Sequence, residues 1–390
     1  MRVSYNMSNI TVCIITTVHP PFDTRIFYKQ AKSLVKAGYK VVLIAQSNEE
    51  KIIDGIKILP IPKPKNRMSR MVFASWQAYK KAKKEKADIY HFHDPELIPM
   101  ALLLKATRNK VIYDIHEDVP KQILSKEWIW KPLRIFIAKL FNIAEKKAAC
   151  YFDAVVTATP TIAEIFNNDY IKVSVVQNFP LLHELLIKDK NHDENNKQGK
   201  YTKLNNAVVY VGGITLIRGA KEMIESVSLL PESYGLKLLL GGKFDPPALE
   251  DELRRYRGWE RTEFLGWLDR KQVAEALTEA RAGLVIIHPE PRYMVSYPVK
   301  MFEYMAAGLP VIASHFPLWE EIIGGNRSGL TVDPLNPEAI AAAIMYLLDN
   351  PEEAEEMGKR GRKAVEEKYN WPVEEKKLLK IYDDIINNHE

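Results

Sequence analysis

The sequence has little cysteine and no long apolar stretch. Cysteine occurs twice in 390 residues, at Cys13 and Cys150, which argues against a disulfide framework and fits a reducing compartment. Both cysteines are flanked by apolar residues in the sequence, and we expect both to be plain core residues. No apolar run approaches the roughly 20 residues that a transmembrane helix needs. Residues 10–17 are apolar but lead into the polar and proline-rich residues 19–21 rather than a small-residue cleavage site, so we expect no signal peptide and a cytoplasmic location.

Acidic and basic residues are nearly balanced over the whole chain but not within its halves. The net charge is +5. Residues 1–180 hold 28 lysine and arginine residues against 16 aspartate and glutamate residues, whereas residues 181–390 hold 27 against 34. A basic half joined to an acidic half indicates that the basic half meets an anionic surface. Because no recognised nucleic-acid-binding motif is present, we expect that surface to be a membrane and no nucleic acid as partner.

The chain alternates between apolar strands and amphipathic helices. With 390 residues, 46% of them apolar and 27% charged, it has the size and composition of a globular protein of two or three domains. The alternation is typical of an α/β fold with parallel sheets. The predicted strands are 10–16, 40–45, 56–61, 88–92, 111–114, 154–158, 173–176, 207–211, 236–240, 284–287 and 310–313. The predicted helices include 24–37, 68–86, 127–141, 269–280, 300–307, 336–349, 351–368 and a last one ending near residue 387.

The segment 296–313 organises the second half of the chain. It predicts a loop, a helix ended by Gly308 and a strand, which follow a short apolar strand and make one unit of a parallel sheet. Free N–H groups at the helix N-terminus suit a phosphate. Glu303 lies one turn into this helix with Lys300 on the same face, where a carboxylate can accept two hydrogen bonds from a vicinal diol such as a ribose. On composition alone, an amphipathic helix with a solvated lysine and glutamate is the simpler interpretation.

The pattern of this segment resembles the signature of glycosyltransferase family 4, S-x-P-x-K-x-x-E-Y-M-A-x-G-x-P-V-I-A. The resemblance implies a retaining enzyme with the GT-B fold, in which two Rossmann-like, doubly wound domains face each other across a cleft. It implies an acceptor-binding domain at 1–185, a linker at 186–206, a donor-binding domain at 207–371, and a C-terminal helix at 372–390 that crosses back onto the first domain. The matching residues are Ser296, Pro298, Lys300, Glu303, Tyr304, Met305, Ala306, Gly308, Pro310, Val311, Ile312 and Ala313.

The resemblance assigns the nucleotide-sugar donor to the second domain. Glu303 would hold the ribose, and the loop Ser296-Tyr297-Pro298 would cradle the diphosphate and the sugar. Gly266 lies in a segment that resembles the one against which the nucleobase lies. Many family members carry a further glutamate eight residues before the second one. Here that position is Val295, so its role is not assigned to this chain.

A second segment is expected to contact the diphosphate. Residues 212–219 resemble the family segment G-R-x-x-x-x-K-G, in which two basic residues neutralise the diphosphate. Arg218 stands where the lysine would be, but Gly213 stands at the arginine position, so one cation is missing. Lys300 or Arg292 would replace it, and we expect Arg218 and Lys300 to act in catalysis. The segment is not G-x-G-x-x-G, which removes the main support for a dinucleotide-dependent oxidoreductase.

Histidine and acidic residues follow two strands of the first domain, at the strand ends where ligands bind in doubly wound sheets. His93 and Asp94 follow one strand. His116 follows another, in a segment that resembles the family segment placing a histidine beside the transferred sugar, so we expect it to be catalytic. Asp23 and Arg25, which follow the first strand, are acceptor-side candidates together with His93 and Asp94. Asp23 would also serve as a helix N-cap.

The same histidines permit a metal site, with His91, His93 and Asp94 as ligands. The family chemistry implied by the resemblance needs no metal. The sequence also contains no D-x-D, the usual metal-diphosphate motif of the other large glycosyltransferase fold. We therefore expect no metal and no other cofactor, with the nucleotide-sugar as co-substrate.

Two segments of the first half combine aromatic and basic residues. In residues 62–86 we expect the aromatic residues to face the core, and the lysine cluster to face solvent or anionic lipid. Residues 127–141 predict either a core helix or an interfacial helix with aromatic anchors and basic flanks. The interfacial interpretation places the protein peripherally on the inner face of the cell membrane. The lysines of the first segment are Lys80, Lys81, Lys83 and Lys84.

These features and the resemblance together predict a retaining hexosyltransferase. It would move a sugar from a UDP-sugar, with a GDP-sugar less favoured, to a glycan or polyprenyl-linked acceptor in the synthesis of surface polysaccharide or glycoconjugate. The expected mechanism is a front-face displacement in which a donor phosphate oxygen takes the acceptor proton. Two alternatives stay open: a nucleotide-sugar epimerase on the same fold, which needs no acceptor, and a non-catalytic nucleotide-sugar-binding subunit of a membrane assembly.

Overall fold

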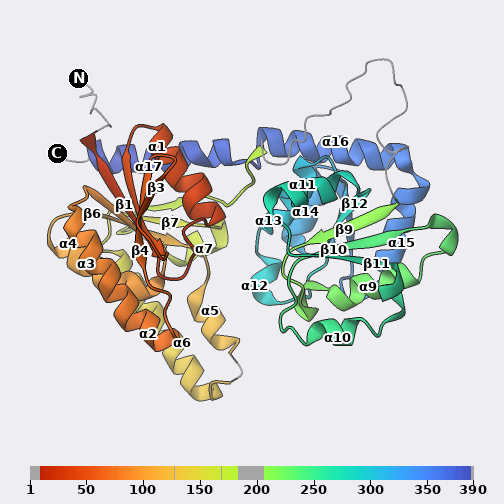
Figure 1. Cartoon of the computed structure of the whole chain (residues 1–390), viewed down its shortest axis with the longest axis horizontal. Helices are drawn as coiled ribbons and strands as arrows, with labels where there is room; N and C mark the ends of the chain where they lie inside the picture. Colours follow the sequence, from red (N-terminus) through yellow and green to blue (C-terminus); the bar gives the residue numbers. More distant parts are fainter. Residues whose placement is uncertain (1–8, 127, 168, 183–205, 388–390) are drawn as a thin grey trace. The chain divides into compact units, whose positions relative to one another are not determined.

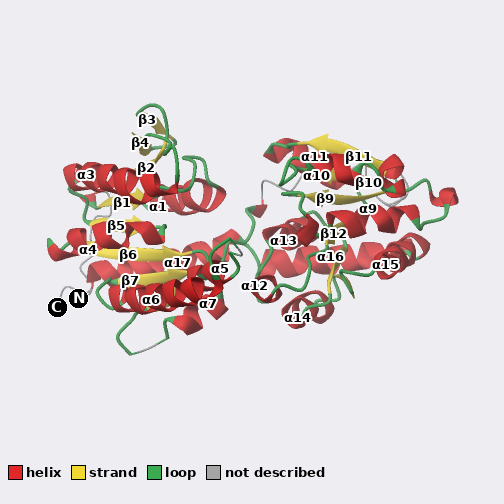
Figure 2. Cartoon of the chain, turned by 90° about the horizontal axis from the view of Figure 1, so that it is seen from below, coloured by secondary structure: helices red, strands yellow, loops and turns green. Residues whose placement is uncertain are grey.

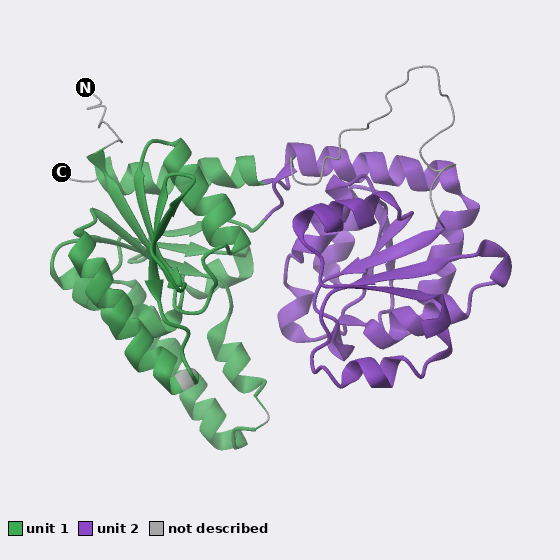
Figure 3. Ribbon diagram, in the orientation of Figure 1, with its two compact units in different colours: residues 1–178, 371–390 green, residues 179–370 purple. Residues whose placement is uncertain are grey.

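The computed structural model describes residues 9–126, 128–167, 169–182 and 206–387. Contacts divide the chain into two compact units, which we call unit 1 (residues 1–178 and 371–390) and unit 2 (residues 179–370) (Figure 3). The chain leaves unit 1 after Asn178 and returns to it at Trp371. Most of the predicted linker, 186–206, lies outside the described residues. Within the described part of the chain, no helix is long and apolar enough to cross a membrane.

Unit 1 is built on an eight-stranded sheet in the order β3-β4-β2-β1-β5-β6-β7-β8. All neighbouring strands are parallel except β3 and β4 at one edge. Because its inner strands are apolar and buried, the sheet needs cover on both faces, and Figure 1 shows helices on both. The strands are β1 (Thr11–Ile15), β2 (Lys40–Gln46), β3 (Lys51–Ile53), β4 (Ile56–Ile61), β5 (Ile89–Phe92), β6 (Lys110–Ile115), β7 (Ala154–Thr157) and β8 (Val173–Val175).

The last helix of the chain completes unit 1. Its first residue, Trp371, donates a hydrogen bond from Nε1 to Ser33 Oγ at 2.9 Å. The buried face of the helix packs against the rest of unit 1, including β8. The helices of unit 1 are η2 (Thr24–Ala31, π-helical), α1 (Lys32–Lys36), α2 (Arg67–Ser69), η3 (Arg70–Ala74, π-helical), α3 (Ser75–Glu85), η4 (Pro95–Leu97), α4 (Ile98–Ala106), α5 (Val119–Leu124), α6 (Lys131–Ala149), α7 (Pro160–Ile165) and α17 (Trp371–Asn387).

Unit 2 is built on a six-stranded parallel sheet in the order β11-β10-β9-β12-β13-β14, again covered by helices on both faces (Figure 2). The strands are β9 (Ala207–Val211), β10 (Lys237–Gly241), β11 (Thr262–Gly266), β12 (Ala282–Val285), β13 (Val311–Ser314) and β14 (Gly329–Val332). The helices are η6 (Leu216–Arg218), α9 (Ala220–Ser228), η7 (Glu232–Tyr234), α10 (Leu249–Leu253), η8 (Arg257–Arg261), α11 (Arg270–Thr278), α12 (Pro291–Met294), α13 (Val299–Ala306), α14 (Pro317–Gly325), α15 (Pro337–Asp349) and α16 (Pro351–Glu367).

The structure confirms the predicted α/β class with two parallel-sheet, Rossmann-like units. Every predicted strand is present, with each end within two residues of its predicted position. The strands that were not predicted, β3, β11 and β14, all lie at sheet edges. Their side chains are only partly buried, so they lack the continuous apolar run that marks an inner strand.

The aromatic residues of 62–86 do not all face the core, and for two of them the expectation is wrong. Phe73 is 67% exposed and Trp76 is 43% exposed, whereas Tyr79 packs against the core of unit 1. The buried contacts of α3 are made by Ser75, Ala78 and Ala82. Because these side chains are small, the helix lies close to the sheet and the larger side chains are left at its outer margin.

Removing packing from α17 should destabilise unit 1 alone. Leu378 is fully buried on this helix, so Leu378→Ala leaves a cavity and should cost about 2–5 kcal/mol of unfolding free energy. Hydrogen exchange should accelerate at the amides of β1 and β6 and stay unchanged at those of β9 and β12. The exposed Lys376→Ala on the same helix is the control. Equal acceleration of hydrogen exchange in both units would show that α17 does not stabilise unit 1 alone.

Candidate active site

The best-defined group of functional side chains in unit 2 lies at the carboxyl ends of its inner strands. β9 leads into Gly212 and Gly213, and η6 carries Arg218 back over them, with Arg218 Nη1 3.4 Å from Gly213 O. Lys300, in the first turn of α13, points to the same loop, and its Nζ lies 3.8 Å from the centroid of the Tyr210 ring. The predicted residues Gly213, Arg218 and Lys300 are therefore brought together.

Lys300 is held there without a counter-charge of its own. Its Nζ is buried and has no hydrogen-bond partner among the residues that the structure describes. Burial, and then the positive charge of Arg218, lower the pKa of Lys300 to about 7, while Glu303 opposes this shift. Two neighbouring cations with a buried, unpartnered nitrogen form a site that an anion would complete.

The two glycines of the loop make room for these cations. A Cβ at Gly212 would lie 2.7 Å from Lys300 Nζ, and a Cβ at Gly213 would lie 2.6 Å from Arg218 Nη1. Gly212 also has φ +147°, a value that side-chain-bearing residues rarely adopt. Gly213, which stands where the family pattern has an arginine, therefore leaves space for Arg218 and does not contribute a charge of its own.

The structure also distinguishes between the two candidates for the second cation. Lys300 lies at the loop beside Arg218, as described above. Arg292 is exposed on α12, and its guanidinium carbon lies 4.6 Å from the centroid of the Tyr293 ring. In this structure it is therefore Lys300 that stands beside Arg218.

Glu303 lies on the same helix but has an additional partner that the sequence did not indicate. Its Oε1 accepts a hydrogen bond from Arg270 Nη1 at 2.7 Å. Arg270 opens α11, directly after the turn that follows Gly266, and Asp269 caps that helix. The only sign of this pairing in the sequence was that Arg270 is a charged residue in the first helical turn after the end of β11. The pair fixes one carboxylate oxygen of Glu303.

The remaining predicted donor residues have structural contacts of their own. Ser296 donates from Oγ to Tyr293 O at 2.8 Å, and its carbonyl accepts from Trp319 Nε1 at 2.8 Å. Tyr297 packs on the core of unit 2, with Phe302 as neighbour. Pro298 is the N-cap position of α13, which has no side-chain cap among the described residues. Its first amide groups therefore stay available to a ligand.

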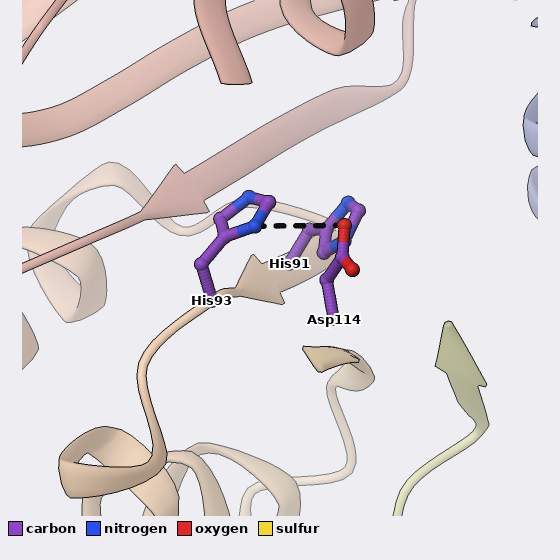
Figure 4. Close-up of side chains that lie close together, drawn as sticks. All are labelled: His91, His93 and Asp114. Carbon is purple, nitrogen blue, oxygen red and sulfur yellow. Dashed lines mark ion pairs between the residues drawn. The ribbon is translucent and has the colours of Figure 1, made fainter. Parts of the chain in front are cut away.

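In unit 1 the carboxyl ends of β5 and β6 gather three histidines around Asp114, and a fourth histidine, which follows β1, lies next to one of them. His91 and His93 come from β5 and its end, and Asp114 comes from β6 (Figure 4). His93 Nδ1 lies 3.6 Å from Asp114 Oδ2 and 3.0 Å from Nε2 of His116. The His19 ring, after β1, lies 5.2 Å from the His116 ring.

A buried ion pair neutralises Asp114. Arg25 donates from Nη2 and Nε to both carboxylate oxygens at 2.9–3.2 Å, and Gln30 Nε2 donates at 2.6 Å. Burial disfavours the charged carboxylate, but Arg25 and then His116 outweigh this, so the pKa of Asp114 lies well below its usual value. Burial lowers the pKa of His91 and, more strongly, of His93, so both rings are neutral at pH 7.

Neutrality of His93 decides which nitrogen of His116 carries hydrogen. His93 Nε2 is buried and has no hydrogen-bond partner within the described residues. An orphaned N–H group costs more than an orphaned ring lone pair, so we assign the hydrogen of His93 to Nδ1, from which it donates to His116 Nε2. With Nε2 accepting this hydrogen bond, the ring hydrogen of His116 lies on Nδ1, the nitrogen that can donate to a ligand. The His116 side chain is 18% exposed.

The same cluster fits a metal ion poorly. His91, His93 and Asp114 bring three ligand atoms within 4.8 Å of one another, with Asp114 in place of the predicted Asp94. Both oxygens of Asp114 already accept hydrogen bonds from Arg25, whose charge would repel a cation. The geometry is that of a neutralised charge network.

The acceptor-side candidates are mostly buried. Arg25, His93 and Asp94 are 2–3% exposed, so they act on a ligand through the residues that they position. Asp94 Oδ2 accepts from Thr16 Oγ1 at 2.9 Å and ties down the loop after β1. Asp23 is the N-cap of η2 and accepts from the amides of Arg25 and Ile26, as predicted. Its side chain is 23% exposed beside His19.

Lys300 should carry a measurable cost in stability. Its pKa is about 7 in the folded chain against 10.5 for the free side chain, so between these values the unfolded chain binds more protons and stability rises with pH. The cost is fully present below pH 7. Lys300→Met should raise the unfolding free energy at pH 7 by on the order of 2–4 kcal/mol, flatten this rise, and abolish calorimetric binding of inorganic pyrophosphate. The exposed Lys271→Met is the control. A variant that is less stable and still binds pyrophosphate would contradict the site.

Comparisons with known proteins cover both units. Residues 24–179 match the family model "Glycosyltransferase Family 4", and residues 187–364 match "Glycosyl transferases group 1". Glycogen synthase of Mycobacterium tuberculosis is 26% identical over 178 residues, which is 45% of this chain and 42% of that protein, so the match spans less than half of the relative. Phosphatidyl-myo-inositol mannosyltransferase of Mycolicibacterium smegmatis is 22% identical, covering 91% of this chain and 88% of that protein.

Solved structures with the same architecture cover nearly the whole chain. Sucrose-phosphate synthase from Thermosynechococcus elongatus has a TM-score of 0.75 at 19% identity, covering 97% of this chain and 99% of that one. HepE from Anabaena, solved in complex with UDP-glucose, has a TM-score of 0.71 at 12% identity, covering 96% of this chain and 100% of that one. At such identities the likeness shows the fold. The two family models and the shared architecture together place this chain in glycosyltransferase family 4, with the GT-B fold.

Proposed function

We propose that this protein is a retaining hexosyltransferase that uses a nucleotide-sugar donor. The observation that carries the proposal is the cation pair Arg218 and Lys300, which converges on a glycine loop at the strand ends of unit 2 with a buried, unpartnered Nζ. A nucleoside diphosphate supplies the negative charge that this pair needs, and Glu303 one turn further along α13 is suited to hydroxyls of a ribose. The donor therefore binds unit 2.

A UDP-sugar is the favoured donor. The fold neighbour HepE was solved with UDP and with UDP-glucose, which supports a uridine nucleotide without excluding a GDP-sugar. The nucleobase would lie along the strand end at Gly266, whose φ of +68° turns the chain away from β11 and leaves its peptide edge free of a side chain. Arg270 next to this turn would hold Glu303 in place for the ribose.

The proposed reaction is a front-face displacement. The bond from the anomeric carbon to the diphosphate breaks, the acceptor oxygen attacks from the same face, and a phosphate oxygen takes its proton. Negative charge grows on the leaving diphosphate, where Arg218 and Lys300 stabilise it. Proton uptake by Lys300, whose pKa is about 7 in the free protein, would strengthen this interaction when the anion binds. The protein supplies positioning and charge rather than a nucleophile.

The proposal assigns the acceptor, a glycan or polyprenyl-linked molecule, to unit 1. His116 is partly exposed, whereas His91 and His93 are buried, and the Nδ1–H assigned above is a hydrogen-bond donor for a sugar hydroxyl. The network of Asp114, Arg25 and His93 holds its ring in that state. The proposal includes no metal ion, because two side-chain cations serve the diphosphate and the sequence has no D-x-D.

Removing Arg218 should slow transfer as well as weaken donor binding. Arg218→Ala should cost on the order of 3 kcal/mol in transition-state stabilisation, because the leaving diphosphate gains charge as the bond breaks. Turnover and donor affinity are measured in excess chelator, with the exposed Arg362→Ala as control. Unchanged kinetics would mean that the diphosphate is bound elsewhere. Activity of the parent chain that vanishes in chelator and returns with manganese would overturn the metal-free mechanism.

Glu303 and His116 should fail in different ways. Glu303→Gln keeps the shape but loses the charged acceptor, so affinity should fall about tenfold for free nucleoside diphosphate and for the donor alike. His116→Ala should leave nucleotide affinity intact and lower the transfer rate by a factor of about 10² or more, because its contact belongs to the transition state. Normal turnover of the folded His116→Ala protein would remove this residue from the catalytic assignment. A product formed from the donor alone would favour an epimerase.

A further inference from the structure

Helix α6 exposes an apolar face where a surface helix normally carries polar side chains. Its buried positions are Ala138, Glu145, Ala148 and Ala149, which include no large apolar residue. Five large apolar side chains are 37–63% exposed and recur at spacings of three and four residues, so they share one side of the helix. These residues are Leu133, Phe136, Ile137, Leu140 and Ile143.

The turn that leads into α6 extends this apolar face with two tryptophans. Trp128 and Trp130 are each 75% exposed. An indole that is mostly exposed to water loses the burial that usually stabilises it, whereas the headgroup region of a bilayer accommodates both its apolar ring and its N–H. Leu124, at the end of α5, is 42% exposed close by in the sequence.

The charged residues from Trp128 through the exposed part of α6 have one sign. Residues 128–144 contain Lys131, Arg134 and Lys139 and no aspartate or glutamate. The next acid along the helix, Glu145, is buried and accepts a hydrogen bond from the Tyr113 hydroxyl at 2.7 Å. Burial raises its pKa to about 7, so it adds little negative charge to the surface. An exposed apolar face on a segment whose charged residues are all basic is complementary to anionic lipid headgroups.

We propose that this surface, Trp128, Trp130 and the outward face of α6, docks unit 1 on an anionic bilayer with the helix lying in the interface. A second copy of the chain is a weaker occupant, because it would set the three basic residues of one copy against those of the other. The proposal rests on the proposed function only in that a polyprenyl-linked acceptor would be offered by the same bilayer.

A second exposed apolar group in unit 1 supports the same orientation. Met68, Met71, Val72, Phe73 and Trp76 are 43–68% exposed along α2, η3 and α3. The α2 end of this segment and the first turns of α6 both lie at the lower end of unit 1 in Figure 1. Lys80 lies over the Trp76 ring at 5.5 Å, so here too a cation accompanies an exposed aromatic side chain.

The test uses the full chain and vesicles of phosphatidylcholine alone or mixed with anionic phosphatidylglycerol. We expect co-sedimentation with the anionic vesicles only, weakening as salt rises. Lys131→Gln with Arg134→Gln should lower the affinity about 30-fold, from about 1 kcal/mol per basic residue. Trp128→Ser with Trp130→Ser should strongly reduce the quenching of indole fluorescence by brominated lipid. Tyr346→Ser, exposed on α15 of unit 2, is the matched control.

The outcomes are separable from those of the proposed function. Melting temperature and the thermal shift caused by UDP are measured on each variant, because these report folding and the donor site alone. Vesicle binding that does not change with salt, lipid charge or the α6 substitutions would overturn the proposal that this surface binds the membrane, even if UDP still binds. A dimer that the tryptophan substitutions convert to monomer, without vesicle binding, would identify a second copy as the occupant and overturn it as well. If UDP did not shift the melting temperature of the unsubstituted protein, this result would instead count against the proposed function.

Discussion

The constraint around which the site of unit 2 is arranged is the burial of the Lys300 ammonium beside a second cation, Arg218, with no anion between them among the described residues. Arg218 and Lys300 are brought to one loop by different parts of the sheet, and the fold leaves Nζ of Lys300 buried and unpartnered among the described residues. Gly212 and Gly213 make this approach sterically feasible. A fold gains nothing in stability from such an arrangement, since burial of an uncompensated ammonium is costly. A ligand that supplies the missing negative charge would offset the cost of burying Lys300. The two cations that destabilise the free protein would then attract the ligand.

Unit 1 solves the opposite problem at the corresponding edge of its own sheet. Asp114 is buried as deeply, but Arg25 and Gln30 satisfy its oxygens. His91 and His93 beside it stay neutral because burial outweighs its attraction. Because the carboxylate of Asp114 is satisfied in the free protein, this network orients a side chain rather than attracting an ion. We therefore interpret unit 2 as built to receive charge and unit 1 as built to hold the His116 ring in one orientation.

The inner strands could be predicted from the sequence, whereas contacts that join distant segments could not. The inner strands carry continuous apolar runs, whereas the edge strands β3, β11 and β14 do not and were missed. Lys300 and Glu303 were found because they share one helical motif. Arg270 was not, since its pairing with Glu303 spans 33 positions. The choice between Lys300 and Arg292 also required coordinates, because sequence spacing does not say which side chain reaches a loop some 80 residues earlier in the chain.

The distribution of polar and apolar side chains on α6 follows the same logic as the cation pair. A helix that needed only to cover the sheet of unit 1 would place its phenylalanine and leucines inward. Here the inward face carries alanines and Glu145, which hydrogen-bonds Tyr113, and the outward face carries Phe136 and Leu140. Folding of unit 1 alone gains little from such an arrangement, because apolar area is stabilising only when it leaves water. An unpartnered ammonium in unit 2 and an uncovered apolar face in unit 1 are each left incomplete by the fold, so each indicates what the protein meets: an anion at one, and an anionic, partly apolar surface at the other.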